Sequence, residues 1–207
     1  MNKKSAKILS MMRILRKLYP HPQCALHYKK PFELLVAVIL SAQCTDKRVN
    51  EVTPALFRKY RAIADYEHAD PLKFEKDIYS TGFYRAKTKN ILAAAKYIDE
   101  RFKGKIPRTI AEMTTIPGVG RKTANVVLGE LYDTAEGITV DTHVIRLTRL
   151  LGLTKHNDAI KIERDLMEVV PPKDWIRFAH SLVLYGREYC PAHCKHADCP
   201  LAKFYIE

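Results

Sequence analysis

Apolar residues recur at helical spacing along most of the chain. Between residues 83 and 102 they return every three or four positions, which predicts an amphipathic helix. The segment 32–40 is apolar all round and too long for a typical strand, so we expect a buried helix there. Two further helices, each opened by an aspartate able to cap it, are expected at 158–169 and 174–187. The pattern predicts an all-α fold.

Alternation of apolar and polar residues, the pattern typical of strands, is almost missing. Only residues 137–140 are briefly β-like. Prolines fall where a helix start or a loop is expected, at Pro54, Pro71, Pro107, Pro171 and Pro172. These positions agree with a series of helices separated by short connections.

The bulk composition is that of a folded globular protein with a strongly basic surface. Hydrophobic residues make up 47% of the 207 positions and charged residues 28%. The longest apolar run, 34–40, is far shorter than the roughly 20 residues that span a bilayer. No secretory segment is recognisable, and we expect a cytoplasmic protein, beside the nucleoid if the source is a prokaryote.

A formal net charge of +12 indicates what kind of partner to expect. Binding to a polyanion releases condensed counterions, so this surplus favours a nucleic acid, although a merely solvated basic face is the simpler alternative. Charge does not distinguish DNA from RNA.

The most informative segment is IPGVGRKTA, which begins at Ile116. It lies between two predicted helices, 109–114 and one that opens near Arg121. Two glycines one residue apart allow a tight turn with positive φ, and their backbone N–H groups can approach a phosphate closely. This pattern is typical of a helix-hairpin-helix that grips DNA without reading bases, although an ordinary helix-helix turn shares it.

Lys122 and Asp141 are the candidate catalytic residues. Lys122 is expected in the first turn of the helix after the hairpin, where the positive end of the helix dipole disfavours an ammonium. The neutral amine that this position favours is a nucleophile. Asp141 precedes an expected helix at 144–151, where simple N-capping is compatible with a chemical role.

Three segments together resemble the endonuclease III family of helix-hairpin-helix DNA glycosylases. They are LSAQCTD from Leu40, the hairpin with Lys122, and VDTH from Val140, in consistent order over about residues 30 to 190. The resemblance implies two helical domains with the active-site cleft between them. One domain would span 25–135, with six helices, and the other 1–24 plus 136–207.

The family resemblance also implies the chemistry. Members remove oxidised pyrimidines from double-stranded DNA and nick the abasic strand. By resemblance Lys122 attacks the sugar while Asp141 assists, Gln43 fills the gap left by the flipped base, and Phe83 matches a wedge position. Phe83 is equally compatible with a core role. The expected DNA-binding set is Gln43, Phe83, Gly118, Val119, Gly120, Arg121 and Thr123. We expect a bifunctional glycosylase and AP lyase that acts as a monomer.

The cysteine-rich tail departs from the family. Three cysteines, Cys190, Cys194 and Cys199, cluster there, which suggests a metal site rather than a disulfide framework. The family carries a [4Fe–4S] cluster on C-x6-C-x2-C-x5-C, whereas this chain has C-x3-C-x4-C and Tyr205 near the fourth position. His193 or His196 is a possible fourth ligand, and three cysteines with one histidine also suit zinc. We expect a lost or degenerate site, with no cofactor needed for catalysis.

Two other readings compete with the enzyme. A non-catalytic helix-hairpin-helix clamp would use Lys122 only as a phosphate contact, but such a clamp needs no carboxylate at Asp141. An RNA-binding helical protein is supported by the basic charge alone. The enzyme is therefore the preferred hypothesis.

Overall fold

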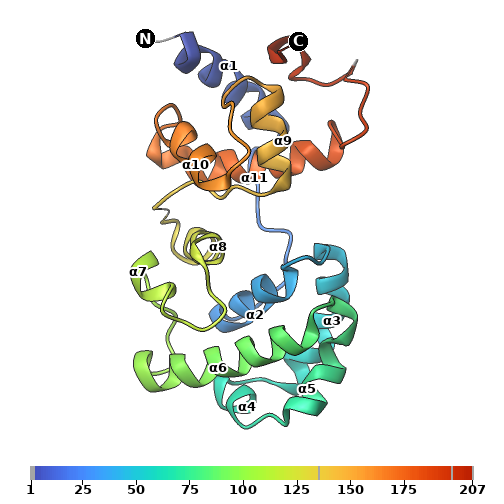
Figure 1. Cartoon of the computed structure of the whole chain (residues 1–207), viewed down its shortest axis with the longest axis vertical. Helices are drawn as coiled ribbons and strands as arrows, with labels where there is room; N and C mark the ends of the chain where they lie inside the picture. Colours follow the sequence, from blue (N-terminus) through green and yellow to red (C-terminus); the bar gives the residue numbers. More distant parts are fainter. Residues whose placement is uncertain (1–2, 135, 197, 207) are drawn as a thin grey trace. The chain divides into compact units, whose positions relative to one another are not determined.

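The computed structural model describes residues 3–134, 136–196 and 198–206, and all regular elements in these ranges are helices (Figure 1). The prediction of an all-α fold is confirmed. The chain divides into two compact units. One comprises residues 24–134, called here the central unit, and the other comprises 1–23 with 135–207, called the terminal unit. None of the described helices combines the length and apolar character needed to cross a membrane.

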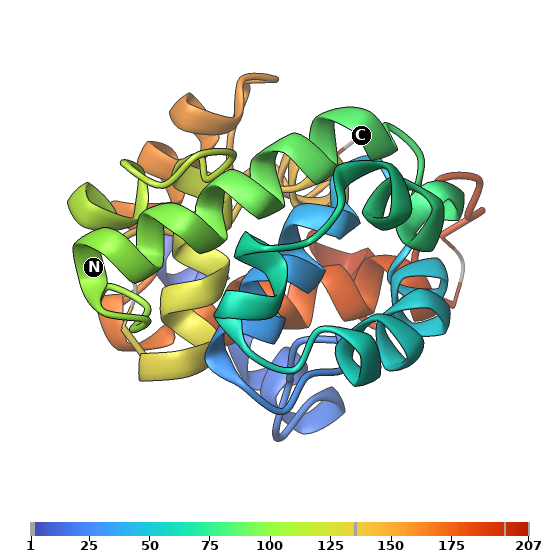
Figure 2. The same cartoon turned by 90° about the horizontal axis from the view of Figure 1, so that it is seen from below.

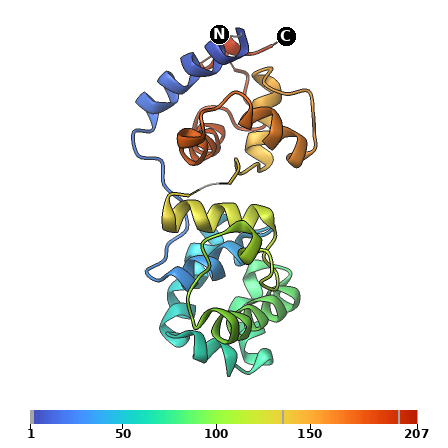
Figure 3. The same ribbon diagram turned by 90° about the vertical axis from the view of Figure 1, so that its left-hand side faces the viewer.

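The central unit is built around α2, which is apolar from residue 32 to residue 40 apart from Glu33. Residues 32–40 of α2 are all buried, as the sequence predicted. Helix α8 lies beside α2 (Figure 3), and α6 packs against α4 and α5 (Figure 2). The elements are α2 (Pro31–Ser41), α3 (Asp46–Lys59), α4 (Ile63–Glu67), α5 (Pro71–Ile78), the 3-10 turn η1 (Tyr79–Thr81), α6 (Tyr84–Phe102), α7 (Ile110–Met113) and α8 (Arg121–Tyr132).

The terminal unit has its own core. Helix α11 packs against both α1 and α9, and Gly186 of α11 lets His143 of α9 come close. A Cβ at Gly186 would lie 2.7 Å from Nδ1 of His143, so no larger residue fits there without movement. The elements are α1 (Lys3–Leu18), α9 (Thr142–Leu150), α10 (Ala159–Met167), η2 (Pro172–Asp174), α11 (Trp175–Glu188) and η3 (Ala202–Phe204).

Two local predictions are wrong. Pro54 lies inside α3 rather than at a helix start or in a loop, because the buried Val49, Thr53 and Leu56 hold that helix against the core on both sides of it. Asp174 does not cap α11 with its side chain. Its carboxylate instead accepts a hydrogen bond from the Arg16 guanidinium at 2.7 Å. Asp158 does cap α10, accepting from the N–H of Lys161 at 3.0 Å.

The β-like stretch 137–140 forms no strand and leads without regular structure into α9. An isolated extended segment has no partner for its backbone groups in a ladder, so alternation over so few residues does not produce a sheet.

Candidate functional site

The IPGVG segment forms a tight turn between α7 and α8. Val119 is buried in the core of the central unit and its N–H donates to the Ile116 carbonyl at 3.0 Å. Gly118 has φ +77°, and a Cβ there would lie 2.5 Å from Cβ of Asn90 on α6. The turn therefore needs a glycine at 118 for two reasons, the left-handed backbone and the close approach of α6. The side chain of Val119 anchors the turn from inside.

Beyond the turn, α8 begins with its polar side facing solvent. Gly120 is the N-cap residue, exposed, and has open space where a Cβ would be. Arg121 and Lys122 are exposed and Thr123 is half-buried, while Ala124 begins the buried face. Lys122 thus lies in the first turn, as predicted, beside the exposed glycines. A phosphate can approach these backbone groups and the positive end of the helix.

Asp141 is the N-cap of α9 in the terminal unit. Its Oδ1 accepts a hydrogen bond from the N–H of Val144 at 2.9 Å, and its backbone carbonyl accepts from Ile145 at 2.8 Å. The capping role that the sequence predicted is confirmed. Capping fixes the carboxylate at a helix start, a position from which it can also act on a substrate. Its pairing with Lys122, which belongs to the other unit, stays a prediction.

Gln43 and Phe83 share an unusual backbone. Both are exposed, and both adopt left-handed conformations, with φ of 53° and 49° respectively. Such values are uncommon for residues with side chains and often mark functional loops. Phe83 keeps 64% of its surface accessible, so it is not an ordinary core aromatic. Its exposure agrees with the wedge role, which remains a prediction.

A buried lysine ties these two loops together, and sequence reasoning missed it. Lys87 is only 4% exposed, and its Nζ donates to the carbonyls of Leu40 at 2.8 Å and Thr81 at 2.7 Å. Leu40 lies just before the Gln43 loop, and Thr81 just before Phe83. Burial lowers the pKa of Lys87. The available signal was its place four residues before Ile91, on the apolar face of α6.

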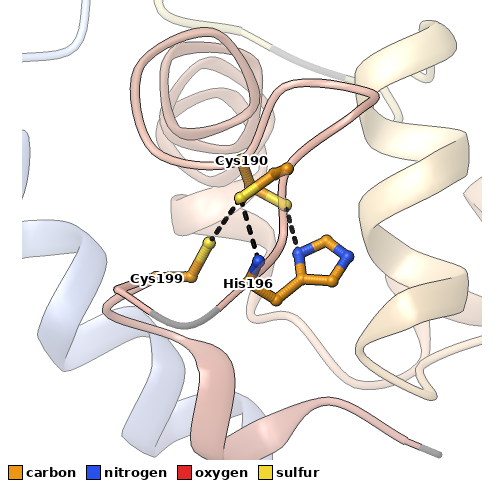
Figure 4. A group of neighbouring side chains, drawn as sticks. Cys190, His196 and Cys199 are labelled. Carbon is orange, nitrogen blue, oxygen red and sulfur yellow. Dashed lines mark hydrogen bonds between the residues drawn. The ribbon is translucent and has the colours of Figure 1, made fainter.

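The cysteine-rich tail brings four ligand atoms together. The side chains of Cys190, His196 and Cys199 point toward one another (Figure 4), and with Cys194 their ligand atoms all lie within 4.8 Å of one another. These residues could bind a metal. Of the two histidines left open by the sequence, His196 is the one in this group.

The ligand set does not fit the family's [4Fe–4S] cluster. In such a cluster four cysteines each bind a different iron, so the thiolates stand around a core of several atoms. Here the group contains three cysteines, with Sγ of Cys194 and Sγ of Cys199 3.3 Å apart. At the fourth cysteine position Tyr205 packs its ring against His196, with centroids 5.1 Å apart. The tail therefore offers three thiolates and one imidazole, not the four thiolates of the family's cluster.

Comparison with known proteins gives a consistent family. The model of the HhH-GPD superfamily of base excision DNA repair proteins matches residues 36–172. Endonuclease III of Synechocystis sp. is 50% identical over 98% of this chain and 93% of its own length. Endonuclease III of Bacillus subtilis is 45% identical, covering 89% and 84%.

Solved structures agree. A non-covalent endonuclease III–DNA complex superposes with a TM-score of 0.93 at 39% identity, covering all of this chain and 97% of that one. A thermostable thymine-DNA glycosylase, 20% identical with a TM-score of 0.81 over 99% and 96% of the two chains, shares the fold. The hairpin, Lys122 and Asp141 all lie within the residues that the family model matches. The chain is a member of the HhH-GPD superfamily of base excision DNA repair proteins and, within it, of the endonuclease III family.

Proposed function

We propose that this base excision repair DNA glycosylase uses Lys122 as its nucleophile and Asp141 as the partner carboxylate, and that it acts on oxidised pyrimidines in double-stranded DNA. The observation that carries the proposal is the exposed Lys122 in the first turn of α8, directly after the Gly118–Gly120 turn. A turn that holds a DNA backbone brings this amine close to the deoxyribose. Gly118, Gly120, Arg121 and Thr123 would supply the backbone contacts, which position the enzyme without reading sequence.

The first chemical step replaces the base by the enzyme's amine. The target nucleotide is flipped out of the duplex, and Gln43 and Phe83 support the distorted stack. Nζ of Lys122 attacks C1′ as the bond from C1′ to the base breaks, and the base leaves with the electron pair and takes up a proton. Asp141 stabilises the positive charge that develops on the sugar or accepts a proton from the amine.

The second step cuts the strand. Opening of the sugar ring leaves an imine between Nζ of Lys122 and C1′. Loss of the proton at C2′ moves electrons toward C3′ and expels the 3′ phosphate by β-elimination, and water then releases the enzyme. Only an amine can form this imine, because a carboxylate can merely direct water to C1′. The chain's own residues carry both steps, without a metal or cofactor in either, and one copy of the chain is sufficient.

Borohydride trapping tests the lysine directly. Reduction of the imine links wild-type protein covalently to abasic-site DNA, and Lys122→Gln is expected to give no adduct. Lys89→Gln removes the same charge from an exposed position on α6 and is the matched control. Asp141→Asn is expected to lose base removal while DNA affinity is kept. An adduct in Lys122→Gln equal to wild type would refute the role of Lys122 and assign the imine to another amine of the chain.

Substrate preference is tested with a panel of duplexes. These carry thymine glycol, dihydrouracil, 8-oxoguanine, a uracil mismatch or an abasic site, and both base loss and strand scission are scored. We expect activity on thymine glycol and dihydrouracil, and we expect strand scission to accompany base loss. Base loss confined to 8-oxoguanine or to the uracil mismatch contradicts the assigned substrate class.

A further inference from the structure

The four tail residues form a set of the size that surrounds one ion. Sγ of Cys194 lies 3.3 Å from Sγ of Cys199, and Sγ of Cys190 lies 3.4 Å from Nδ1 of His196. All four ligand atoms lie within 4.8 Å of one another. Cys190 and Cys199 are buried, and the other two are half-buried. The group is thus drawn together and largely shielded from water.

These separations can be compared with the geometry of zinc. With Zn–S bonds of about 2.3 Å, two thiolates on one ion stand about 3.8 Å apart in a tetrahedron and at most about 4.6 Å apart. The observed separations of 3.3 and 3.4 Å lie within about 0.5 Å of the tetrahedral value, and a pair at the outer limit of 4.8 Å would have to close by about 1 Å. Small side-chain adjustments therefore complete a tetrahedron. Three cysteines with one histidine are also a common structural zinc set.

The surroundings favour a negatively charged metal complex. Three thiolates and one Zn²⁺ carry a net charge of −1, and the guanidinium of Arg146 on α9 donates to Sγ of Cys190 at 3.4 Å and to the carbonyl of Cys190. The backbone N–H of His196 donates to Sγ of Cys194 at 3.2 Å. Donors of this kind stabilise thiolate ligands and fix their orientation. Around a bound metal these donors would offset the negative charge of the thiolates.

Tyr205 closes the other side of the group. Its ring packs against His196, and its hydroxyl lies 3.0 Å from the hydroxyl of Tyr185 on α11. The ring supports the imidazole of His196, whose Nδ1 lies 3.4 Å from Sγ of Cys190. The substitution of the fourth thiolate and the recruitment of His196 are therefore consistent with each other.

We propose that Cys190, Cys194, His196 and Cys199 bind a single Zn²⁺ in a closed, structural site that replaces the iron–sulfur cluster. The ion joins the 190–199 loop into one unit, and Arg146 connects it to α9. Because all four positions around the ion are taken by protein, the site has no open position for catalysis.

Metal analysis of the purified protein tests this directly. We expect about one zinc per chain, little iron or sulfide and no broad absorbance near 400 nm. Replacement of zinc by Co²⁺ is expected to give the intense visible bands of tetrahedral cobalt bound to thiolates. Cys199→Ser and His196→Ala are expected to lose most of the zinc. His196→Cys, which restores a four-ligand set, should retain it.

A control variant and independent readouts separate the outcomes. Cys24→Ser removes a cysteine of the central unit and is expected to keep the full zinc content. Chelation is expected to lower the melting temperature of wild type but not that of Cys199→Ser. Iron and sulfide near four per chain, or a metal-free protein with three titratable tail thiols or a Cys194–Cys199 disulfide, overturns the proposal. These measurements do not involve DNA, so their failure is distinct from failure of the proposed function.

Discussion

Two alanine substitutions in the same turn are expected to affect different properties, Gly118→Ala the stability and Gly120→Ala the affinity for DNA. Gly118→Ala places a side chain on a backbone with φ +77°, for which the left-handed conformation costs roughly 1–2 kcal/mol. The new Cβ would lie 2.5, 2.8 and 2.9 Å from Cβ, Cγ and Nδ2 of Asn90. Carbon atoms in contact normally stand about 3.5–4.0 Å apart, so the turn or α6 must move by about 1 Å.

The total cost follows from these two terms. Overpacking of this kind costs typically 1–3 kcal/mol, and because the nearest atom is a Cβ, Asn90 cannot relieve it by a rotamer change alone. We therefore expect Gly118→Ala to lower the free energy of unfolding by about 2–5 kcal/mol. Gly120 has an extended backbone, φ −88° and ψ 172°, and open space at its Cβ position. Gly120→Ala should cost less than about 1 kcal/mol, as a poorer N-cap.

For DNA affinity, in contrast to stability, we expect Gly120→Ala to have the larger effect of the two substitutions. A methyl group at 120 occupies the space through which a phosphate would reach the first backbone N–H groups of α8. Loss of one hydrogen bond to a charged group costs about 1.5–3 kcal/mol, which corresponds to at least a tenfold weaker complex.

Urea denaturation and titration of a fluorescent abasic-site duplex measure the two quantities. Equal stability losses in both variants, or a Gly118→Ala protein as stable as wild type, would refute the account of the turn. Wild-type DNA affinity in Gly120→Ala would refute the phosphate contact.

Two further predictions concern buried polar groups in the central unit. Lys87→Met leaves the carbonyls of Leu40 and Thr81 without their donor and should lower the free energy of unfolding by about 2 kcal/mol in urea denaturation. Lys89→Met, exposed on the same helix, should change it by no more than about 0.5 kcal/mol. Similar values for both variants would contradict a stabilising role for the hydrogen bonds of Lys87. The Tyr66 hydroxyl is buried with no hydrogen-bond partner among the described residues, so Tyr66→Phe should raise the free energy of unfolding by roughly 0.5–2 kcal/mol at pH 7. Burial, and secondarily the carboxylate of Glu33, raises the pKa of Tyr66 above the usual 10.0, so the folded state holds this proton more tightly than the unfolded chain. That contribution is complete below pH 10 and is lost as the pH rises beyond it, so wild type should lose more stability than Tyr66→Phe between pH 9 and 11; parallel losses would show that Tyr66 does not contribute.

The sequence by itself determined the elements whose causes are local. Residues 32–40 are apolar on all sides apart from Glu33, a pattern that predicts a buried helix, and α2 is that helix. Asp141 and Asp158 cap helices because a carboxylate two or three residues before an N–H reaches it without help from the rest of the fold. The glycine pair predicted the turn before α8 in the same way.

Only the tertiary structure decided the contacts made across long separations in the sequence. From the sequence alone Lys87 resembles a surface lysine, but in the fold its Nζ donates to the carbonyls of Leu40 and Thr81. Asp174 binds Arg16, 158 residues away, instead of capping its own helix. The sequence left His193 and His196 as equal candidates for a fourth ligand, and the course of the tail puts His196 beside Cys190. In each case the free energy of a polar group depends on its hydrogen-bond partner and on its exposure to water. Both are decided only when segments distant in the sequence pack together.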